Sequence, residues 1–250
     1  MYNTLNIATF NIHKGFTHFN THFSLQNQRE LIRKLNADVV FLQEVQDTHA
    51  KHSQHIDVHS ASRQLQYLAD NVWSNFAYGK NAVYPTGHHG NGILSKFPIT
   101  KVNNQDISAH RLEQRGMLHC QINIPQWESP LHAICVHLGL LATWRRQQLG
   151  AIADYIEQHV PIHAPLIIAG DFNDWTMRSG RVFAKRLHLL EVFEDHKSKP
   201  ARSFPGWLPI LRVDRIYARG FQINHTEVHS GPHFIKLSDH AILTAKLNKK

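Results

Sequence analysis

The hydrophobic pattern predicts a chain in which short buried strands outnumber helices. Apolar runs of strand length, some continuous and some alternating with polar residues, recur along the sequence. They occupy residues 5–10, 38–43, 91–96, 117–124, 132–138, 165–170, 212–218, 221–228 and 241–247. This many strands is enough for two sheets.

Four other segments space their apolar residues at helical intervals. Ser24 precedes the first, 25–36, as the expected N-cap, and Ser60 opens a second, 60–72, in the same way. A third helix is predicted from Thr143 to His159, and a shorter one over 181–190. Helices that interrupt two groups of strands favour two sheets packed face to face with helices outside, an α/β (α+β) fold.

Length and composition indicate one domain over residues 1–250. The chain is 42% hydrophobic and has no internal repeat or linker-like stretch. No apolar run approaches the 18 residues of a membrane span, and the opening MYNTLNIATF lacks the features of a signal peptide. We therefore expect a soluble, cytoplasmic monomer without a transmembrane segment.

The net charge limits the kinds of partner that we expect, and the cysteine and histidine content limits the kinds of metal site. The formal charge of +8 favours a polyanion, either nucleic acid or an anionic membrane surface. Cys120 and Cys135 are the only cysteines, and we expect both to be buried thiols. The 21 histidines cluster at 52–60 and in GHHG, 87–90, without a matching cysteine or carboxylate, so we expect surface or loop histidines and no structural zinc site.

Acids, amides and histidines stand at the ends of several predicted strands. LIIAGDFND places Asp171 and Asn173 directly after a buried run, and SDH places Asp239 and His240 before the last strand. Four further residues occupy comparable positions: Asn11, Glu44, His137 and Asp214. Turn chemistry is the simple alternative, because Gly, Asp and Asn form ordinary turns. Convergence at one sheet edge would instead build a site on a rigid scaffold.

Such a set suits phosphoester hydrolysis. Glu44, Asn11 and Asp239 offer hard oxygen ligands for Mg²⁺ or Mn²⁺. Asp171 would deprotonate a water molecule. The Asn173 amide would donate a hydrogen bond to the phosphoryl group as negative charge develops on it. Asp214 would hold His240 in one tautomer beside a phosphate oxygen or the leaving group.

The ordered motifs TFNIHKG, LQEV, NGILSK, VHLGL, IIAGDFND, RVDRIYA and SDHAIL resemble the endonuclease/exonuclease/phosphatase superfamily. The resemblance runs through almost the whole chain and is closest to a small bacterial branch, YbhP-like, of unsettled substrate. It implies a four-layer α-β-β-α sandwich with two packed mixed sheets, and metal-dependent cleavage of phosphoester bonds. Glu44 would be the main metal ligand, with Asn11 and Asp239 nearby.

The same resemblance makes Asp171 and Asn173 the catalytic pair, with Asp214 and His240 as the acid and imidazole. His137 matches a histidine of the deoxyribonuclease and sphingomyelinase branches. Two departures stand out. His13 replaces the Asp or Trp of many relatives, and no Asp or Glu occurs between Asp70 and Asp106 to pair with His137 as in pancreatic-type deoxyribonucleases.

Four cationic or amide side chains beside the motifs are candidate substrate contacts: Lys14, Asn91, Arg115 and Arg145. Alternatively, these side chains are ordinary solvated groups that contact no substrate. The leading hypothesis is a nuclease acting on DNA. The same chemistry on a phospholipid, inositol phosphate or other phosphorylated small molecule is the second, with FPGWLPIL (204–211) as its supporting feature, although we expect that loop to be buried or partly buried. A non-catalytic nucleic-acid-binding module is the third.

Overall fold

The computed structural model describes residues 2–17, 22–49, 64–69, 72–84, 87–111 and 113–250. Within these residues the strands form two six-stranded mixed sheets. Sheet 1 has the order β11-β12-β1-β2-β4-β3 and contains β1 (Thr4–Asn11), β2 (Val39–His49), β3 (Asn75–Tyr84), β4 (Gly87–Ser95), β11 (Phe221–His229) and β12 (Ile242–Lys249). Sheet 2 has the order β5-β6-β7-β8-β10-β9 and contains β5 (Ile99–Asp106), β6 (Gly116–Ile122), β7 (Leu131–His137), β8 (Leu166–Asp171), β9 (Leu190–Glu191) and β10 (Asp214–Arg219).

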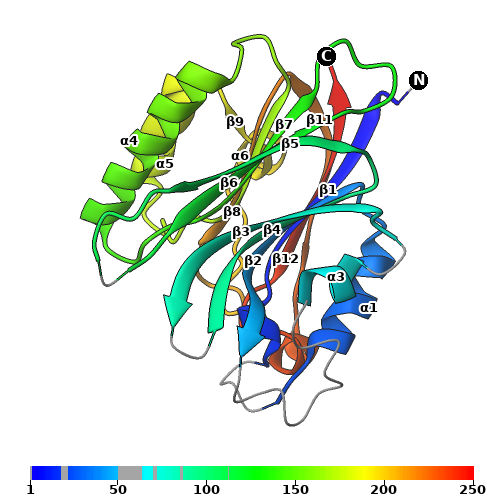
Figure 1. Ribbon diagram of the computed structural model, residues 1–250, viewed down its shortest axis with the longest axis vertical. Coiled ribbons are helices and arrows are strands. Elements are labelled where there is room, and N and C mark those ends of the chain that lie inside the picture. The colour runs from blue at the N-terminus through cyan, green and yellow to red at the C-terminus, as the bar shows by residue number, and fades with distance from the viewer. Residues whose placement is uncertain (1, 18–21, 50–63, 70–71, 85–86, 112) are drawn as a thin grey trace.

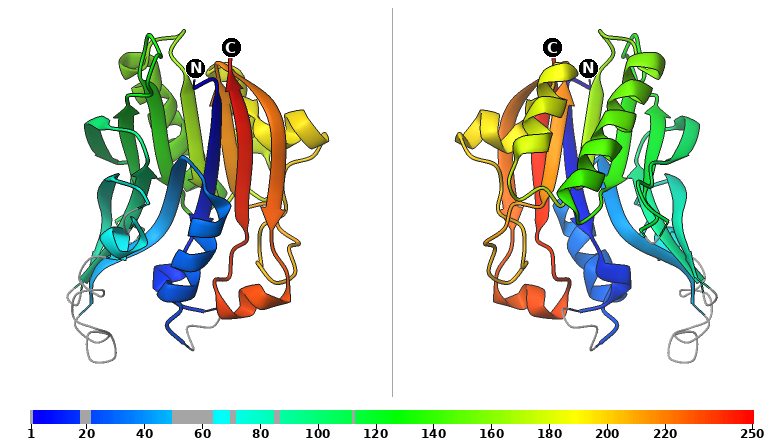
Figure 2. Two further views of the ribbon diagram at one scale, coloured as in Figure 1. Left: turned by 90° about the vertical axis from the view of Figure 1, so that its right-hand side faces the viewer. Right: turned by 90° about the vertical axis from the view of Figure 1, so that its left-hand side faces the viewer.

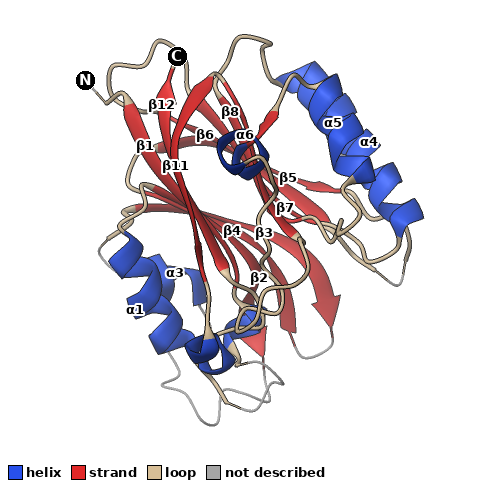
Figure 3. Ribbon diagram, turned by 180° about the vertical axis from the view of Figure 1, so that it is seen from behind, coloured by secondary structure: helices blue, strands red, loops and turns tan. Residues whose placement is uncertain are grey.

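Helices cover the outer faces of the two packed sheets, as Figures 1 and 3 show from opposite sides. Sheet 1 carries α1 (Leu25–Leu35) and α3 (Gln64–Ala69), and sheet 2 carries α4 (Ala142–His159) and α5 (Arg178–Arg186). A short α6 (Val192–Lys197) packs on β10 and β11. The arrangement is the predicted four-layer sandwich. None of the described helices has both the length and the apolar character needed to cross a membrane.

The apolar runs are continuous because both faces of the central strands are buried. Ile167 faces the core between the sheets, while its neighbour Ile168 faces the core beneath α4 and α5. Successive side chains of a strand point to opposite faces, so a strand buried on both sides needs apolar residues at every position.

Each predicted strand and helix is present, with shifted boundaries, but three strands were not predicted. β3 is interrupted by a β-bulge between Lys80 and Ala82, and β5 is an edge strand whose side chains are mostly exposed. Neither therefore has the apolar signature of a core strand. The predicted last helix stops at Arg186, and Leu190 begins the two-residue β9.

Two local predictions need correction. Ser24 occupies the N-cap of α1, but its hydroxyl makes no capping bond and instead donates to the backbone oxygen of Lys236 over 2.6 Å. That bond ties α1 to the 3₁₀ helix η3 (Pro232–Lys236). The GHHG histidines belong to strand β4 and not to a loop. Ser60 and the histidines of 52–60 lie outside the described residues.

The segment that follows β1 and the segment that precedes β12 lie at the same end of the sandwich (Figure 2). Figure 2 shows η3 and the 3₁₀ helix η1 (His13–Gly15) at the end of the molecule opposite the two termini. Most of the polar residues singled out from the sequence gather around this end.

Candidate active site

Four predicted site residues stand at strand ends that meet. Asn11 ends β1, His137 ends β7, Asp171 ends β8 and Asp214 begins β10. Because β7 runs parallel to β8, its last residue is aligned with Asp171. Because β10 runs antiparallel to β8, its first residue is aligned with Asp171 as well. Strand direction alone therefore brings the three side chains of sheet 2 together.

The Asn11 side chain joins the two sheets at this point. Its Nδ2 donates to Glu44 Oε1 over 3.3 Å and to Asp171 Oδ2 over 3.2 Å. Its Oδ1 accepts from the backbone N–H of His13 over 3.0 Å. Since Glu44 belongs to sheet 1 and Asp171 to sheet 2, one amide group holds carboxylates from both sheets close to each other.

An irregularity in β2 accompanies the placement of Glu44. The pairing of β2 with β4 shifts register between Leu42 and Val45, and Glu44 has a φ of +56°. A β-bulge of this kind re-aims a side chain that a regular strand would direct elsewhere. A left-handed φ is also found at three nearby residues: His13, Lys14 and Asn173. Backbone strain of this kind collects at functional sites, where the surrounding structure imposes it.

Glu44 is an anion at ordinary pH. Burial alone would raise the pKa of its carboxyl, but His137, Lys14, His89 and His13 lower it to about 2. Lys14 Nζ lies 3.7 Å from Glu44 Oε2. An ionised carboxylate is the form that binds a divalent cation.

His240 and Asp214 form a buried hydrogen-bonded pair. His240 Nδ1 lies 2.9 Å from Asp214 Oδ2, and His240 Nε2 lies 3.8 Å from Asp171 Oδ2. Burial would lower the pKa of His240, but Asp214, Asp171 and Asp239 raise it well above its ordinary value. The imidazole is therefore a cation at neutral pH, with Nε2 turned toward Asp171.

Asp171 is the most central carboxylate of the group. Burial, together with repulsion from Asp214 and Glu44, raises its pKa to about 6, against the lowering effect of the His240 cation. Its Oδ1 accepts from the backbone N–H of Asn173 over 2.9 Å. Asp171 is thus ionised at neutral pH and yet more basic than an ordinary aspartate, which suits a proton acceptor.

His137 lies beside Asp171 and has a histidine neighbour that the sequence did not point to. His137 Nε2 is 3.5 Å from Asp171 Oδ2, and burial together with Arg115 lowers the pKa of His137 well below its ordinary value. His89, from the GHHG stretch of β4, is buried and acts electrostatically on both His137 and Glu44. Burial lowers the pKa of His89 to about 4, although Glu44 opposes this effect. The segment between Asp70 and Asp106 therefore supplies an uncharged imidazole to the site and no carboxylate.

Asn173 and Asp239 complete the predicted chemical set. Asn173 Nδ2 donates to the backbone oxygen of Leu138 over 3.0 Å, which uses one of its two N–H groups and ties the end of β8 to the segment after β7. Asp239 is partly exposed, and its Oδ1 lies 3.5 Å from His13 Nδ1. His13, which departs from the pattern of many relatives, is thus the neighbour of a predicted metal ligand.

The four predicted substrate contacts divide into two kinds. Lys14 and Arg115 act on site residues, Lys14 on Glu44 and Arg115 on His137. Asn91 is fully buried and donates to the backbone oxygens of Gly116 and Cys135. Arg145 is also buried, and its guanidinium donates to the backbone oxygens of Gly139 and Leu140. Asn91 and Arg145 therefore support the backbone around the site.

Glu44 and Asp239 each carry a carboxylate that suits a hard divalent cation. The Glu44 side chain is 18% exposed and the Asp239 side chain 20%, so water and ions can reach both. Carboxylate oxygens are preferred ligands of Mg²⁺ and Mn²⁺. Asp171, Asp214 and His240 also bring potential ligand atoms within 4.8 Å of one another. A protonated imidazole cannot bind a metal, however, so the raised pKa of His240 disfavours that trio.

The 204–211 loop lies against His240, and its first residues are partly buried as expected, whereas its tip is exposed. The Phe204 ring centroid is 5.1 Å from that of the His240 ring. The Gly206 N–H donates to the backbone oxygen of Asp239 over 2.7 Å. Leu211 N–H donates to the Phe204 oxygen over 2.7 Å, which closes the loop on itself. Trp207, Leu208 and Ile210 consequently point outward and are exposed.

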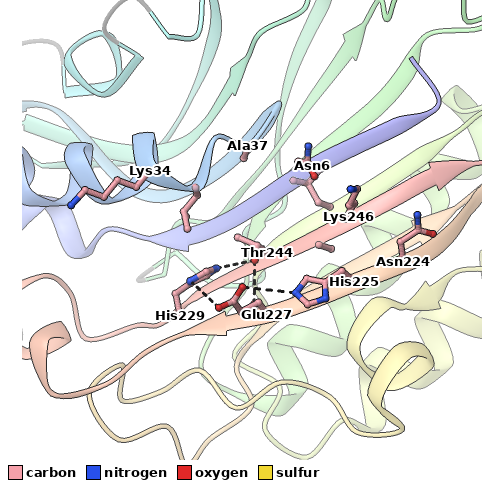
Figure 4. A pocket seen from close by; sticks show the side chains of 12 residues that line it. Asn6, Lys34, Ala37, Asn224, His225, Glu227, His229, Thr244 and Lys246 are labelled. Atoms are coloured by element: carbon pink, nitrogen blue, oxygen red, sulfur yellow. Dashed lines mark hydrogen bonds and ion pairs between the residues drawn. The ribbon is translucent and has the colours of Figure 1, made fainter. Parts of the chain in front are cut away.

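A separate cavity of about 630 Å³ lies along β11 and β12 (Figure 4). Glu227 lies 3.9 Å from His225 and 3.7 Å from His229, and His229 Nε2 is 2.9 Å from the hydroxyl of Thr244. None of the predicted site residues is among the described residues that line this cavity. These polar groups interact with one another, and the cavity is distinct from the site at the strand ends.

Known proteins with similar sequences point the same way as the geometry. Residues 8–240 match the model of the "Endonuclease/Exonuclease/phosphatase family". The chain is 41% identical over 242 residues to "Uncharacterized protein YbhP" of Escherichia coli (strain K12), which covers 97% of this chain and 95% of that protein. A YbhP of Shigella flexneri matches to the same extent.

Solved structures with lower identity share the fold. An endonuclease/exonuclease/phosphatase from Beutenbergia cavernae has a TM-score of 0.79 at 20% identity, over 99% of this chain and 72% of that one. The human Nocturnin catalytic domain with bound sulfate has a TM-score of 0.74 at 16% identity, over 100% and 94%. A mannosyl-6-phosphatase from Bacteroides thetaiotaomicron has a TM-score of 0.71 at 15% identity, over 97% and 99%.

Proposed function

Because the chain belongs to the endonuclease/exonuclease/phosphatase family, we propose that it is a divalent-metal-dependent phosphodiesterase that hydrolyses phosphoester bonds. The observation that supports this most directly is the Asn11 amide, which contacts a carboxylate of each sheet. It places an anion suited to a cation, Glu44, next to a carboxylate suited to accept a proton, Asp171. Metal-assisted hydrolysis of a phosphoester uses a metal ligand and a proton acceptor close to the same phosphate group.

In the proposed mechanism Glu44, with Asn11 and Asp239, would hold Mg²⁺ or Mn²⁺. The bound ion would polarise a phosphoryl oxygen and stabilise the negative charge that develops there. Asp171 orients a water molecule and accepts its proton as the new oxygen–phosphorus bond forms. The free N–H group of Asn173 donates to a non-bridging oxygen.

The His240 cation serves as the general acid in this scheme. Its Nε2 donates a proton to the leaving oxygen as the bond between that oxygen and phosphorus breaks. Asp214 keeps the imidazole protonated and oriented through Nδ1. Both pKa values are raised, which makes Asp171 a better proton acceptor than a free aspartate and keeps His240 protonated until it acts as the acid. His137 and His89, both uncharged at neutral pH, offer hydrogen bonds beside the phosphate without adding charge.

Hydrolysis of bis(4-nitrophenyl) phosphate with Mg²⁺ or Mn²⁺ tests this proposal without assuming a natural substrate. Asp171→Ala should lower the rate by about 10²–10⁴-fold, the usual contribution of general base catalysis. Asp154→Ala, which removes an exposed carboxylate of α4, is the matched control and should leave the rate unchanged. Equal activity of Asp171→Ala and wild type would contradict the role of Asp171.

DNA remains a candidate substrate on the basis of the +8 charge, which favours a polyanion. A panel of plasmid, abasic duplex, single-stranded DNA, RNA, inositol phosphate and phospholipid would separate the candidates. Each is compared between the wild type and Asp171→Ala, so that a contaminating nuclease cannot account for the result.

A further inference from the structure

Exposed apolar side chains collect on four segments that adjoin the candidate site, which we call the rim loops: 138–146, 172–178, 202–212 and 230–237. Eight large apolar side chains on them are between 37% and 57% exposed: Leu140, Leu141, Trp175, Trp207, Leu208, Ile210, Leu211 and Ile235. Single exposed apolar residues are normal on a protein surface, but a gathering of this size around a polar site marks an interaction surface.

Three of the rim loops contain or contact a site residue directly, and the fourth is bound to one of these three. The first is bound through Leu138 O to Asn173, and the second contains Asn173 itself. The third is bound through Gly206 to the backbone of Asp239, and the fourth through Gly231 N–H to Gly206 O over 3.1 Å. The apolar residues therefore border the site and are not scattered over the molecule.

The first two rim loops also contact each other through a cation and an aromatic ring. The Arg145 guanidinium lies 5.0 Å from the centroid of the Trp175 ring. Arg145 is buried and held by the backbone of the first rim loop, so it supports the half-exposed Trp175 from below. Tryptophan is the residue that most often sits where an apolar phase meets a polar one.

The charge of the rim loops has one sign. They expose four basic side chains: Arg146, Arg178, Arg202 and Lys236. Asp174 is the only acidic residue in the four segments, and it is 2% exposed with its carboxylate bound to Gly180 N–H and the Thr176 hydroxyl. The rim loops are therefore both apolar and basic, and they carry no exposed carboxylate.

An anionic phospholipid surface has the matching properties. Its headgroups attract exposed lysine and arginine, and its acyl region accepts leucine, isoleucine and tryptophan side chains. A nucleic acid would also use the cations and could stack bases on Trp175 or Trp207. It would leave exposed aliphatic residues such as Leu141, Leu208 and Ile210 without an apolar partner.

We propose that the rim loops seat the protein on an anionic phospholipid surface, so that the phosphodiester of a lipid headgroup reaches the candidate site. This inference rests on the proposed phosphodiesterase function and specifies its substrate class. The apolar side chains enter the boundary between headgroups and acyl chains, and the basic side chains contact neighbouring lipid phosphates.

Vesicle flotation of the full chain tests the proposal without relying on catalysis. We expect the wild type to float with vesicles of phosphatidylcholine and phosphatidylglycerol, and at least about tenfold less with phosphatidylcholine alone. Leu208→Ser combined with Ile210→Ser should lower the partition coefficient on the anionic vesicles about tenfold or more. The control combines Val102→Ser with Ile162→Ser, which are equally exposed but lie outside the rim loops, and should float like the wild type.

Tryptophan fluorescence gives a second readout that does not depend on those variants folding. Lipids brominated on the acyl chain should quench part of the emission of the wild-type protein, and Trp207→Phe should remove much of that quenching. Absence of quenching, or equal flotation of the rim and control variants, would overturn the proposal. Cleavage of DNA by a protein that does not float would do so as well, while leaving the phosphodiesterase function intact. Failure to hydrolyse any phosphodiester would instead count against the proposed function, whatever the flotation result.

Discussion

His240 Nδ1 lies 2.9 Å from Asp214 Oδ2, although the two residues stand 26 positions apart in the chain and adjoin different sheets. Asp214 begins β10 in sheet 2, and His240 precedes β12 in sheet 1. The contact fastens the two sheets at the candidate site and keeps the imidazole protonated at the same time.

Replacement of Asp214 by asparagine should lower the rate of phosphodiester hydrolysis by about 10²–10⁴-fold. Asparagine is almost the same shape but lacks the charge, so the pKa of His240 should fall and the basic limb of the pH–rate profile should move to lower pH. Rates are measured from pH 5 to 9 with saturating Mg²⁺. The hypothesis fails if Asp214→Asn keeps both the rate and the profile of the wild type.

Replacement of Glu44 by glutamine should weaken Mg²⁺ binding by at least about tenfold, because the neutral amide removes the charge while preserving the size. Isothermal calorimetry with Mg²⁺ or Mn²⁺ measures the affinity directly. Glu157→Gln, at an exposed carboxylate of α4, is the matched control and should bind as the wild type does. Unchanged affinity in Glu44→Gln would place the metal elsewhere.

Replacement of Gly206 by alanine should disturb the site through its backbone. An added Cβ would lie 2.7 Å from the carbonyl carbon and oxygen of His240, so the loop or His240 must shift. We expect a loss of about 1–3 kcal/mol in the free energy of unfolding and a lower rate. Gly150→Ala is the control, since nothing lies within 4 Å of its added Cβ in α4, and it should stabilise the protein by about 0.5–1 kcal/mol. Urea unfolding of both variants decides between a local steric effect and a general effect of glycine loss.

A buried histidine cluster on the face of sheet 2 that α4 covers should make the folded protein less stable in acid. His119 Nε2 is 3.0 Å from His132 Nδ1, and its Nδ1 is 3.0 Å from the hydroxyl of Tyr155. Burial, with repulsion from His132, lowers the pKa of His119 to about 4. The unfolded chain takes up this proton near pH 6.5 and the folded chain only near pH 4, so stability is full above pH 6.5 and is lost as the pH falls through that window.

The loss attributable to His119 should be about 2–3 kcal/mol between pH 7.5 and pH 4.5. Urea unfolding of the wild type and of His119→Gln at the two pH values measures it. The variant should lose less stability on acidification than the wild type, even if it is less stable at pH 7.5. An equal loss in both proteins would assign the acid sensitivity to other groups.

Much of the candidate site was predictable because its residues stand at strand ends. A run such as LIIAG is buried on both faces, so the polar residues that follow it must lie where the strand leaves the core. The predicted positions of Asn11, Asp171, Asp214 and His240 needed no more than this pattern and the motifs around them. Asp214 lies beside Asp171 because β10 pairs with β8, whereas Asn11, 3.2 Å from Asp171, and His240, 3.8 Å from it, are brought there by the packing of the two sheets, which no local pattern encodes.

Other features were decided by the tertiary structure. The histidines of GHHG were expected at the surface or in a loop, yet pairing with β2 and β3 makes His89 part of a strand and buries it where it acts on Glu44. Glu44 itself stands at a bulge with a left-handed φ, a conformation imposed by its neighbours. The amino-acid sequence by itself determined which segments are buried and which residue types lie at their ends, because burial depends on the side chains of each segment. Only the packed sheets decided which of those residues meet, and which apolar side chains remain exposed around them, because both depend on contacts between segments far apart in the chain.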